Sequence, residues 1–250
     1  DTMNGQNLSL QVHPLTEYIQ QHFNMKYTQD ESYYLLDAQG EDPCVFLGLR
    51  TGVQPEEMMQ ALKAAQQGGA PFPAERFVNR IPVKKHDHVL IPAGTVHCSG
   101  ANTMVLEISA TPYIFTFKLW DWGRVDLDGK PRPIHLEHGA ANIQWYRNTE
   151  WVHRNLVNAV AEVYTGENGT VVRTGLHERE FLDTFRFTTS SPLPVHRNVS
   201  VHMLNLVDGT RAVLRSKSDA FPPLELHYAE TCIVPQAAGD YEISSPEGSE

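Results

Sequence analysis

The chain has 250 residues, of which 41% are hydrophobic and 9% aromatic, so it is expected to be globular, with one large core or two modest ones. A formal net charge of -10, with no basic cluster longer than Lys84-Lys85, argues against nucleic acid as a partner. No apolar run approaches the ~20 residues of a membrane-spanning helix, and three widely spaced cysteines favour a reducing cytoplasm over a disulfide framework.

Strand patterns begin almost at once after Asp1, which predicts a fragment whose first barrel is incomplete at its N-terminus. The patterns are short runs rich in β-branched and aromatic residues, at 8–13, 33–36, 44–49, 89–91, 103–108 and 113–118. A helix is predicted from Pro55 until Gly68-Gly69, and a second helical stretch from about Leu136 to Val163. The even spacing of the strands predicts a barrel or sandwich with a helical insertion.

A second group of strand patterns follows at 180–187, 199–206 and 211–215, with Asp208-Gly209 typical of a hairpin turn. We therefore expect a mainly β protein in two parts. Residues 1–155 would form the metal-binding domain, and residues 156–250 a smaller, degenerate β-unit that packs without a metal.

Four residues of the first part form a candidate metal site. Gln11 and His13 are two apart in a strand and therefore point to the same face. Glu31 enters the next strand, and the proline-glycine turn in 91–97 places His97 at the start of another. Each fragment alone is common in proteins without a metal. Together they would leave a divalent ion a net charge of about +1 and open coordination positions, as a Lewis acid requires.

Three motifs resemble type I mannose-6-phosphate isomerase, or phosphomannose isomerase. They are Leu8-Ser-Leu-Gln-Val-His-Pro14, Ile91-Pro-Ala-Gly-Thr-Val-His97, and Asp121-Trp-Gly-Arg124 followed by Gly129-Lys-Pro-Arg-Pro-Ile-His135. The motifs occur in the family's order, and the resemblance is strong over residues 5 to 145. It implies a cupin (jelly-roll) fold, a zinc-dependent site, and interconversion of mannose 6-phosphate and fructose 6-phosphate through an enediol.

The resemblance also implies residue roles. The ligands of one divalent ion would be Gln11, His13, Glu31 and His97. The ion would be zinc, although these ligand types also suit manganese, iron, cobalt or nickel. Arg124 would be the catalytic arginine, and Ser9 and Lys130 would contact the sugar phosphate. A structural salt bridge near Asp126 and Asp128 is the alternative for Arg124 and Lys130.

Glu107 is a candidate for the proton shuttle, because the turn at 99–102 folds its strand back beside that of His97. Metal-bound water is another candidate, and a carboxylate that only supports the ligands or the core is equally compatible with the pattern.

One position departs from the family, because Gln29 stands where a lysine commonly precedes the glutamate ligand. This change puts the phosphorylated substrate in question and leaves the metal ligands intact. The leading hypothesis is a cytoplasmic isomerase of carbohydrate metabolism that binds a small sugar phosphate. An isomerase-like enzyme for another sugar and a non-catalytic sugar-sensing cupin are the alternatives. The sequence does not specify the oligomeric state.

Overall fold

The computed structural model describes residues 1–111, 115–176, 178–189, 191–196 and 200–245. The chain forms two compact units, one of Asp1–Ala159 with Gly175–Asp183 and one of Val160–Thr174 with Thr184–Glu250. It therefore leaves the first unit after Ala159, returns to it once, and leaves it again. The two-domain division at residue 155 stays a prediction, because packing alone does not define an independently folding domain.

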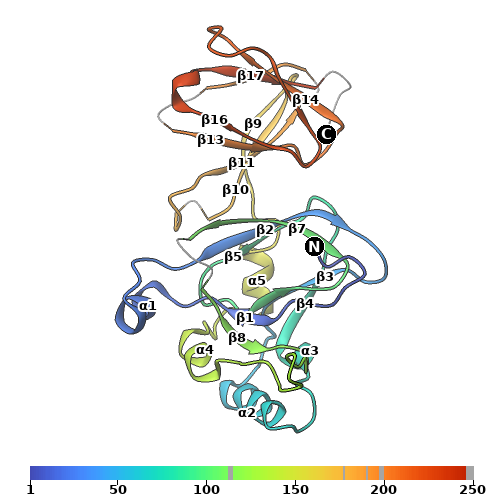
Figure 1. Ribbon diagram of the computed structural model, residues 1–250, viewed down its shortest axis with the longest axis vertical. Helices are drawn as coiled ribbons and strands as arrows, with labels where there is room; N and C mark the ends of the chain where they lie inside the picture. The colour runs from blue at the N-terminus through green and yellow to red at the C-terminus, as the bar shows by residue number, and fades with distance from the viewer. Residues whose placement is uncertain (112–114, 177, 190, 197–199, 246–250) are drawn as a thin grey trace. The chain divides into compact units, whose positions relative to one another are not determined.

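The described strands of the first unit, β1 to β8, form two antiparallel sheets (Figure 1). The larger sheet has the order β4-β3-β6-β1-β8, with bounds Val78–Pro82, Cys44–Leu49, His97–Ser99, Leu10–Val12 and Phe117–Trp120. The smaller sheet has the order β5-β2-β7, with bounds His88–Ile91, Asp30–Ala38 and Thr103–Ala110. Among the described strands no pairing joins the two sheets into a closed barrel. The mainly β fold with a helical insertion is confirmed.

The helices of the first unit are α1 to α5, with bounds Thr16–Phe23, Pro55–Gln66, Ala74–Phe77, Leu136–Asn142 and Thr149–Asn155. The helix predicted from Pro55 is confirmed as α2. The single helical stretch from Leu136 to Val163 is wrong, because α4 stops before Ile143 and a new helix begins after Asn148, whose side chain accepts a hydrogen bond from the Trp151 amide. Within the described residues, no helix is both long and apolar enough to cross a membrane.

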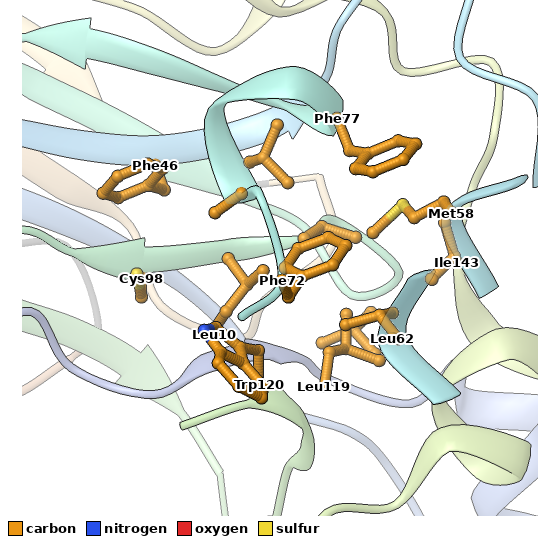
Figure 2. Packing of buried hydrophobic residues seen from close by; sticks show 14 of the residues in the cluster. Leu10, Phe46, Met58, Leu62, Phe72, Phe77, Cys98, Leu119, Trp120 and Ile143 are labelled. Atoms are coloured by element: carbon orange, nitrogen blue, oxygen red, sulfur yellow. The ribbon is translucent and has the colours of Figure 1, made fainter. Parts of the chain in front are cut away.

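Alternation along the strands separates two cores in the first unit. On β3, Cys44 and Phe46 belong to the cluster under the helices, whereas Val45 and Leu47 belong to a second cluster. Figure 2 shows the first cluster, built from helix and strand residues that include Met58, Leu62, Phe72, Phe77, Leu119 and Trp120. Strand residues that alternate with this cluster point to the other face of the larger sheet.

The second unit is built from β-strands. Its sheets have the orders β11-β10-β9, β12-β17-β14-β15 and β13-β16. The bounds of β9 to β17 are Ala161–Gly166, Gly169–Thr174, Thr184–Thr189, Leu193–Val195, His202–Asn205, Arg211–Ser216, Leu224–His227, Thr231–Val234 and Tyr241–Ser244. Its core cluster is Val195, Leu214, Leu226, Val234 and Tyr241.

Three predicted strands differ from the structure in their bounds. The strand at 180–187 begins only at Thr184, because Glu180 lies in the segment that returns to the first unit. The strand at 199–206 is β13, shorter at both ends, and residue 199 lies outside the described residues. Of the strand predicted at 113–118, residues 113 and 114 also lie outside the described residues. Residues 115 and 116 are described but belong to no strand, and β8 begins at Phe117.

Candidate metal centre

The two sheets of the first unit carry three of the predicted ligands, and His13 directly follows β1. Gln11 on β1 and His97 on β6 are direct partners across the larger sheet. Because Leu10 and Val12 belong to the helix-covered core, Gln11 points to the opposite face. Glu31 comes from β2 of the smaller sheet. The candidate site therefore receives side chains from two different sheets.

The predicted ligands lie together. The Nε2 atom of His13 is 3.3 Å from Oε2 of Glu31, and the Nε2 atom of His97 is 3.0 Å from Oε1 of the same carboxylate. One ligand atom from each of these three buried residues lies within 4.8 Å of the others. The fourth predicted ligand, Gln11, places its Nε2 atom 3.2 Å from Nε2 of His97.

Backbone carbonyls orient both imidazoles. Nδ1 of His13 donates to the Phe115 carbonyl at 2.9 Å, and Nδ1 of His97 donates to the Thr95 carbonyl at 2.9 Å. This arrangement leaves each Nε2 atom to face the carboxylate, as in histidines that ligate metals. Within the described residues, Nε2 of His13 and Oε1 of Glu31 are buried without a hydrogen bond, although both lie within ion-pair distance of a partner. Such converging, unsatisfied atoms fit a divalent cation.

The charges at the centre also favour a cation. Burial alone would lower the pKa of His13, but the Glu31 carboxylate outweighs burial and raises that pKa above its ordinary value. Burial would raise the pKa of Glu31, but the close approach of the His13 and His97 imidazoles holds it well below its usual range. The carboxylate therefore stays ionised and stabilises positive charge beside it. A divalent ion bound there would supply that charge in place of protons.

A tight turn joins β5 to β6, the strand that carries His97. In the turn from Pro92 to Thr95, the Thr95 amide donates to the Pro92 carbonyl at 3.1 Å. Gly94 has φ +85°, and a Cβ atom there would lie 2.9 Å from a backbone oxygen, so the turn requires glycine. The Gly94 amide donates to the His13 carbonyl at 2.9 Å, and the Ala93 amide donates to Oδ1 of Asp30 at 2.7 Å. The turn therefore fixes three ligand-bearing segments relative to one another.

Arg147 supports the same turn, and sequence reasoning missed it. Arg147 is only 2% exposed. Its Nη1 atom donates to the Pro92 and Ala93 carbonyls at 2.8 Å each and to Thr95 Oγ1. No local pattern marks this arginine, since its partners lie more than fifty positions earlier in the chain. Only the folded chain identifies Arg147 as part of the centre.

Glu107 lies beside the ligands and is linked to them by Gln29. The Gln29 amide donates to Oε2 of Glu31 at 2.8 Å and to Oε1 of Glu107 at 3.2 Å. Burial, together with the negative charge of Glu31, raises the pKa of Glu107. The structure therefore brings the candidate proton-transfer group to the metal centre.

Ser9 and Arg124 form a second cluster around the buried carboxylate of Asp121. Ser9 Oγ donates to Asp121 Oδ1 at 2.8 Å, Arg124 Nε donates to the same oxygen at 2.9 Å, and Arg124 Nη2 also contacts it. Arg132 Nη1 lies 3.5 Å from the other carboxylate oxygen. Burial would raise the pKa of Asp121, but the Ser9 and Arg124 hydrogen bonds lower it. Lys130 is exposed, and its main-chain amide donates to Asp126 Oδ1 at 2.9 Å.

No hydrogen bond or ion pair between described residues joins the Asp121 cluster to the metal ligands. The roles predicted for Ser9, Arg124 and Lys130 stay predictions. Asp121 was not predicted, although its place before the tryptophan-glycine-arginine motif was a local signal for it.

Two antiparallel sheets thus bring together a buried group of two histidines and one glutamate that could hold a metal ion. No protein-family model matches the chain. The chain is 31% identical over 139 residues to mannose-6-phosphate isomerase ManA of Bacillus subtilis (strain 168), covering 56% of this chain and 41% of that protein. It is 30% identical over 131 residues to the probable mannose-6-phosphate isomerase GmuF of the same organism, covering 52% of this chain and 38% of that protein.

Solved structures extend the likeness of fold to nearly the whole chain. Mannose 6-phosphate isomerase from Bacillus subtilis superposes with a TM-score of 0.72 at 16% identity, over 96% of this chain and 69% of that one. A mannose 6-phosphate isomerase bound with zinc and yttrium gives a TM-score of 0.62 at 14% identity, over 96% and 74%. The chain spans about two-fifths of the length of the curated relatives it matches. The resemblance to type I mannose-6-phosphate isomerases is confirmed in sequence and in fold.

Proposed function

We propose that this chain carries the active site of a metal-dependent aldose-ketose isomerase that interconverts mannose 6-phosphate and fructose 6-phosphate through an enediol. The observation that carries the proposal is the convergence of His13, Glu31 and His97 on one buried point, in a chain whose sequence relatives are named mannose-6-phosphate isomerases. The free cysteines, Cys44, Cys98 and Cys232, support a cytoplasmic location. The proposed reaction of a sugar phosphate would place the protein in carbohydrate metabolism.

The ion would be held by His13, Glu31 and His97, with Gln11 as the fourth ligand. Two imidazoles, a carboxylate and an amide suit zinc, the metal in one of the solved structures of similar fold. When bound, a divalent ion supplies Lewis-acid stabilisation of the negative charge that develops on a sugar oxygen. The buried, cation-favouring environment of the three residues is what supports this assignment.

The protein's own groups supply the remaining chemistry. Glu107, whose pKa is raised by burial and by Glu31, exchanges the proton that moves between C1 and C2 of the open-chain sugar. Arg124, oriented by Asp121, stabilises developing negative charge on the sugar oxygens. Ser9 and the exposed Lys130 contact the phosphate.

A second candidate substrate follows from Gln29. This side chain is buried and engages Glu31 and Glu107 with a neutral amide, where a lysine would add positive charge. One cation fewer near the sugar favours a substrate without a phosphate at this wall of the site. A free hexose, or another hexose phosphate, is therefore the alternative substrate.

A coupled assay with mannose 6-phosphate, free mannose and other hexose phosphates separates these candidates. Turnover of mannose 6-phosphate above the others is the expected result. In the His97→Ala variant, bound metal and turnover should be lost together, whereas the exposed His153→Ala control should keep both. Full activity in a metal-free His97→Ala protein would contradict the proposed function.

A further inference from the structure

The backbone on both sides of Gln29 is fixed before β2 begins. Thr28 Oγ1 donates to the Pro14 carbonyl, and the Asp30 carboxylate accepts from the Ala93 amide at 2.7 Å. Between these anchors the Gln29 side chain is only 2% exposed. A buried amide in such a constrained segment has few alternative positions, so its contacts are determined by the fold.

Every polar atom of the Gln29 side chain is engaged. Its Nε2 atom donates to Oε2 of Glu31 at 2.8 Å and to Oε1 of Glu107 at 3.2 Å, and its Oε1 atom accepts from the Phe115 amide at 3.4 Å. A carboxamide has two N–H donors, and both are used here on carboxylates. Gln29 thus joins a predicted metal ligand to the candidate proton-transfer group.

Only one orientation of this amide satisfies its neighbours. If the amide were flipped, its Oε1 atom would face both carboxylates and its NH₂ group would face the Phe115 N–H, so no hydrogen bond would form. The same residue also orients a ligand, because the Phe115 carbonyl accepts from Nδ1 of His13. The main chain of Phe115 therefore fixes both the His13 imidazole and the Gln29 amide.

We propose that Gln29 is a positioning residue, whose amide holds the carboxyl groups of Glu31 and Glu107 as one rigid pair at the wall of the metal site. The catalytic effect of positioning Glu107 rests on the proposed function, because only an isomerase uses that carboxyl for proton transfer. The effect of positioning Glu31 is independent of the proposed function, because the orientation of a ligand affects metal affinity whatever the substrate.

The test replaces Gln29 by methionine, which keeps the length of the side chain and removes the amide. Gln54→Met is the matched control, since Gln54 is an exposed glutamine beside α2 whose Nε2 atom also donates a hydrogen bond. Zinc affinity is measured by chelator competition, and kcat and KM are measured with mannose 6-phosphate. Both substitutions are also made in a Glu107→Gln background. Thermal melts establish that each variant is folded, and Gln29→Asn replaces Gln29→Met if the latter does not fold.

The Gln29→Met variant is expected to bind zinc about tenfold more weakly, as for partners that orient ligands. Its kcat is expected to fall about tenfold with KM little changed, and to show no further loss when Glu107 is already glutamine. The Gln54→Met control should match the unmodified protein.

Equal losses of kcat with and without the Glu107 carboxylate would overturn the proposal, as would unchanged zinc affinity. If the unmodified protein binds zinc but converts no sugar, the proposed function fails by itself. The zinc affinity of Gln29→Met then still decides whether Gln29 holds Glu31.

Discussion

Glu31 and Asp121 are both buried carboxylates with lowered pKa values, yet their surroundings differ. Asp121 accepts hydrogen bonds from Ser9 and Arg124, so its charge is already compensated by the protein. Glu31 faces two imidazole Nε2 atoms, which carry positive charge only when the imidazoles are protonated. The contacts of Asp121 stabilise the fold, whereas the negative charge of Glu31 leaves a position that a metal cation can occupy. Burial of a carboxylate alone does not distinguish these two cases.

The largest expected effect comes from replacing the carboxylate at the metal centre. Glu31→Gln removes the only charged ligand among the predicted ones. Metal affinity should therefore fall by more than about 100-fold, which is the upper limit for residues that only orient ligands. Isothermal titration with zinc measures this change. Retention of full zinc affinity would show that Glu31 belongs with Asp121, as a structural carboxylate.

Removing Arg124 tests whether the Asp121 cluster also takes part in catalysis. In Arg124→Ala the metal should stay bound, since no hydrogen bond or ion pair among the described residues links Arg124 to the ligands. The kcat should fall about 100-fold, the range for a group that stabilises charge in the transition state. Metal content and steady-state kinetics are measured together. An unchanged kcat would make this arginine a purely structural partner of Asp121.

The matching change at the second carboxylate should affect stability instead of metal binding. Asp121→Asn removes the charge that Ser9 and Arg124 stabilise, which should lower the free energy of unfolding by about 2 kcal/mol. Urea denaturation measures the loss, and zinc titration should give the affinity of the unmodified protein. A loss of zinc binding in this folded variant would contradict the separation of the two clusters.

Glu180 sharpens the contrast as a half-buried carboxyl beside other negative charges. Burial, reinforced by the negative charge of Asp30, raises its pKa to about 7. Because this value lies above the ordinary 4.5, the folded chain binds the proton more tightly than the unfolded chain. Its stabilising contribution is complete below about pH 4.5 and is lost as the pH rises through about 7.

The Glu180→Gln variant should therefore lose less stability than the unmodified protein between pH 5 and pH 8, a range of about three units around that pKa. Denaturation at several pH values checks this, with the exposed Glu178→Gln as control. Identical pH profiles for the Glu180→Gln variant and the unmodified protein would show that this carboxyl keeps an ordinary pKa.

The smallest effect is expected at Lys130. The side chain is exposed, so Lys130→Ala should leave stability and metal binding unchanged. If the side chain contacts a phosphate, KM for mannose 6-phosphate should rise about threefold, as for one solvent-exposed ion pair, while kcat stays the same. Steady-state kinetics with mannose 6-phosphate, and with free mannose as the comparison substrate, test this. An equal rise in KM for both sugars would exclude a phosphate contact.

The ligand positions could be predicted from the sequence because their signals are local. Gln11 and His13 follow from strand alternation, and the turn before His97 follows from proline and glycine. The supporting residues could not be predicted in this way. Arg147 hydrogen-bonds to that turn from more than fifty positions later in the chain. The Phe115 carbonyl that orients His13 is a main-chain group, so the type of side chain at this position does not indicate its role.

The errors in the fold arose where tertiary contacts outweigh local pattern. Residues 180–183 include the apolar Phe181 and Leu182, but the segment belongs to the first unit, where the Phe181 ring lies edge-on to Tyr27 with ring centroids 5.7 Å apart. Helix formers continue past Leu136, yet the Asn148 side chain caps a new helix instead of extending the old one. Both cases show a contact with a distant or capping partner that a pattern of residue types does not contain.

The return of Gly175–Asp183 to the first unit has a consequence for synthesis on the ribosome. Chains emerge from their N-termini, so Asp1–Ala159 is released before the segment that completes its unit. Leu176 packs against the second core cluster, which stays partly uncovered until that segment arrives. A nascent chain halted between Ala159 and Gly175 would expose this apolar surface. The rate of translation over the following residues therefore determines how long the surface stays exposed.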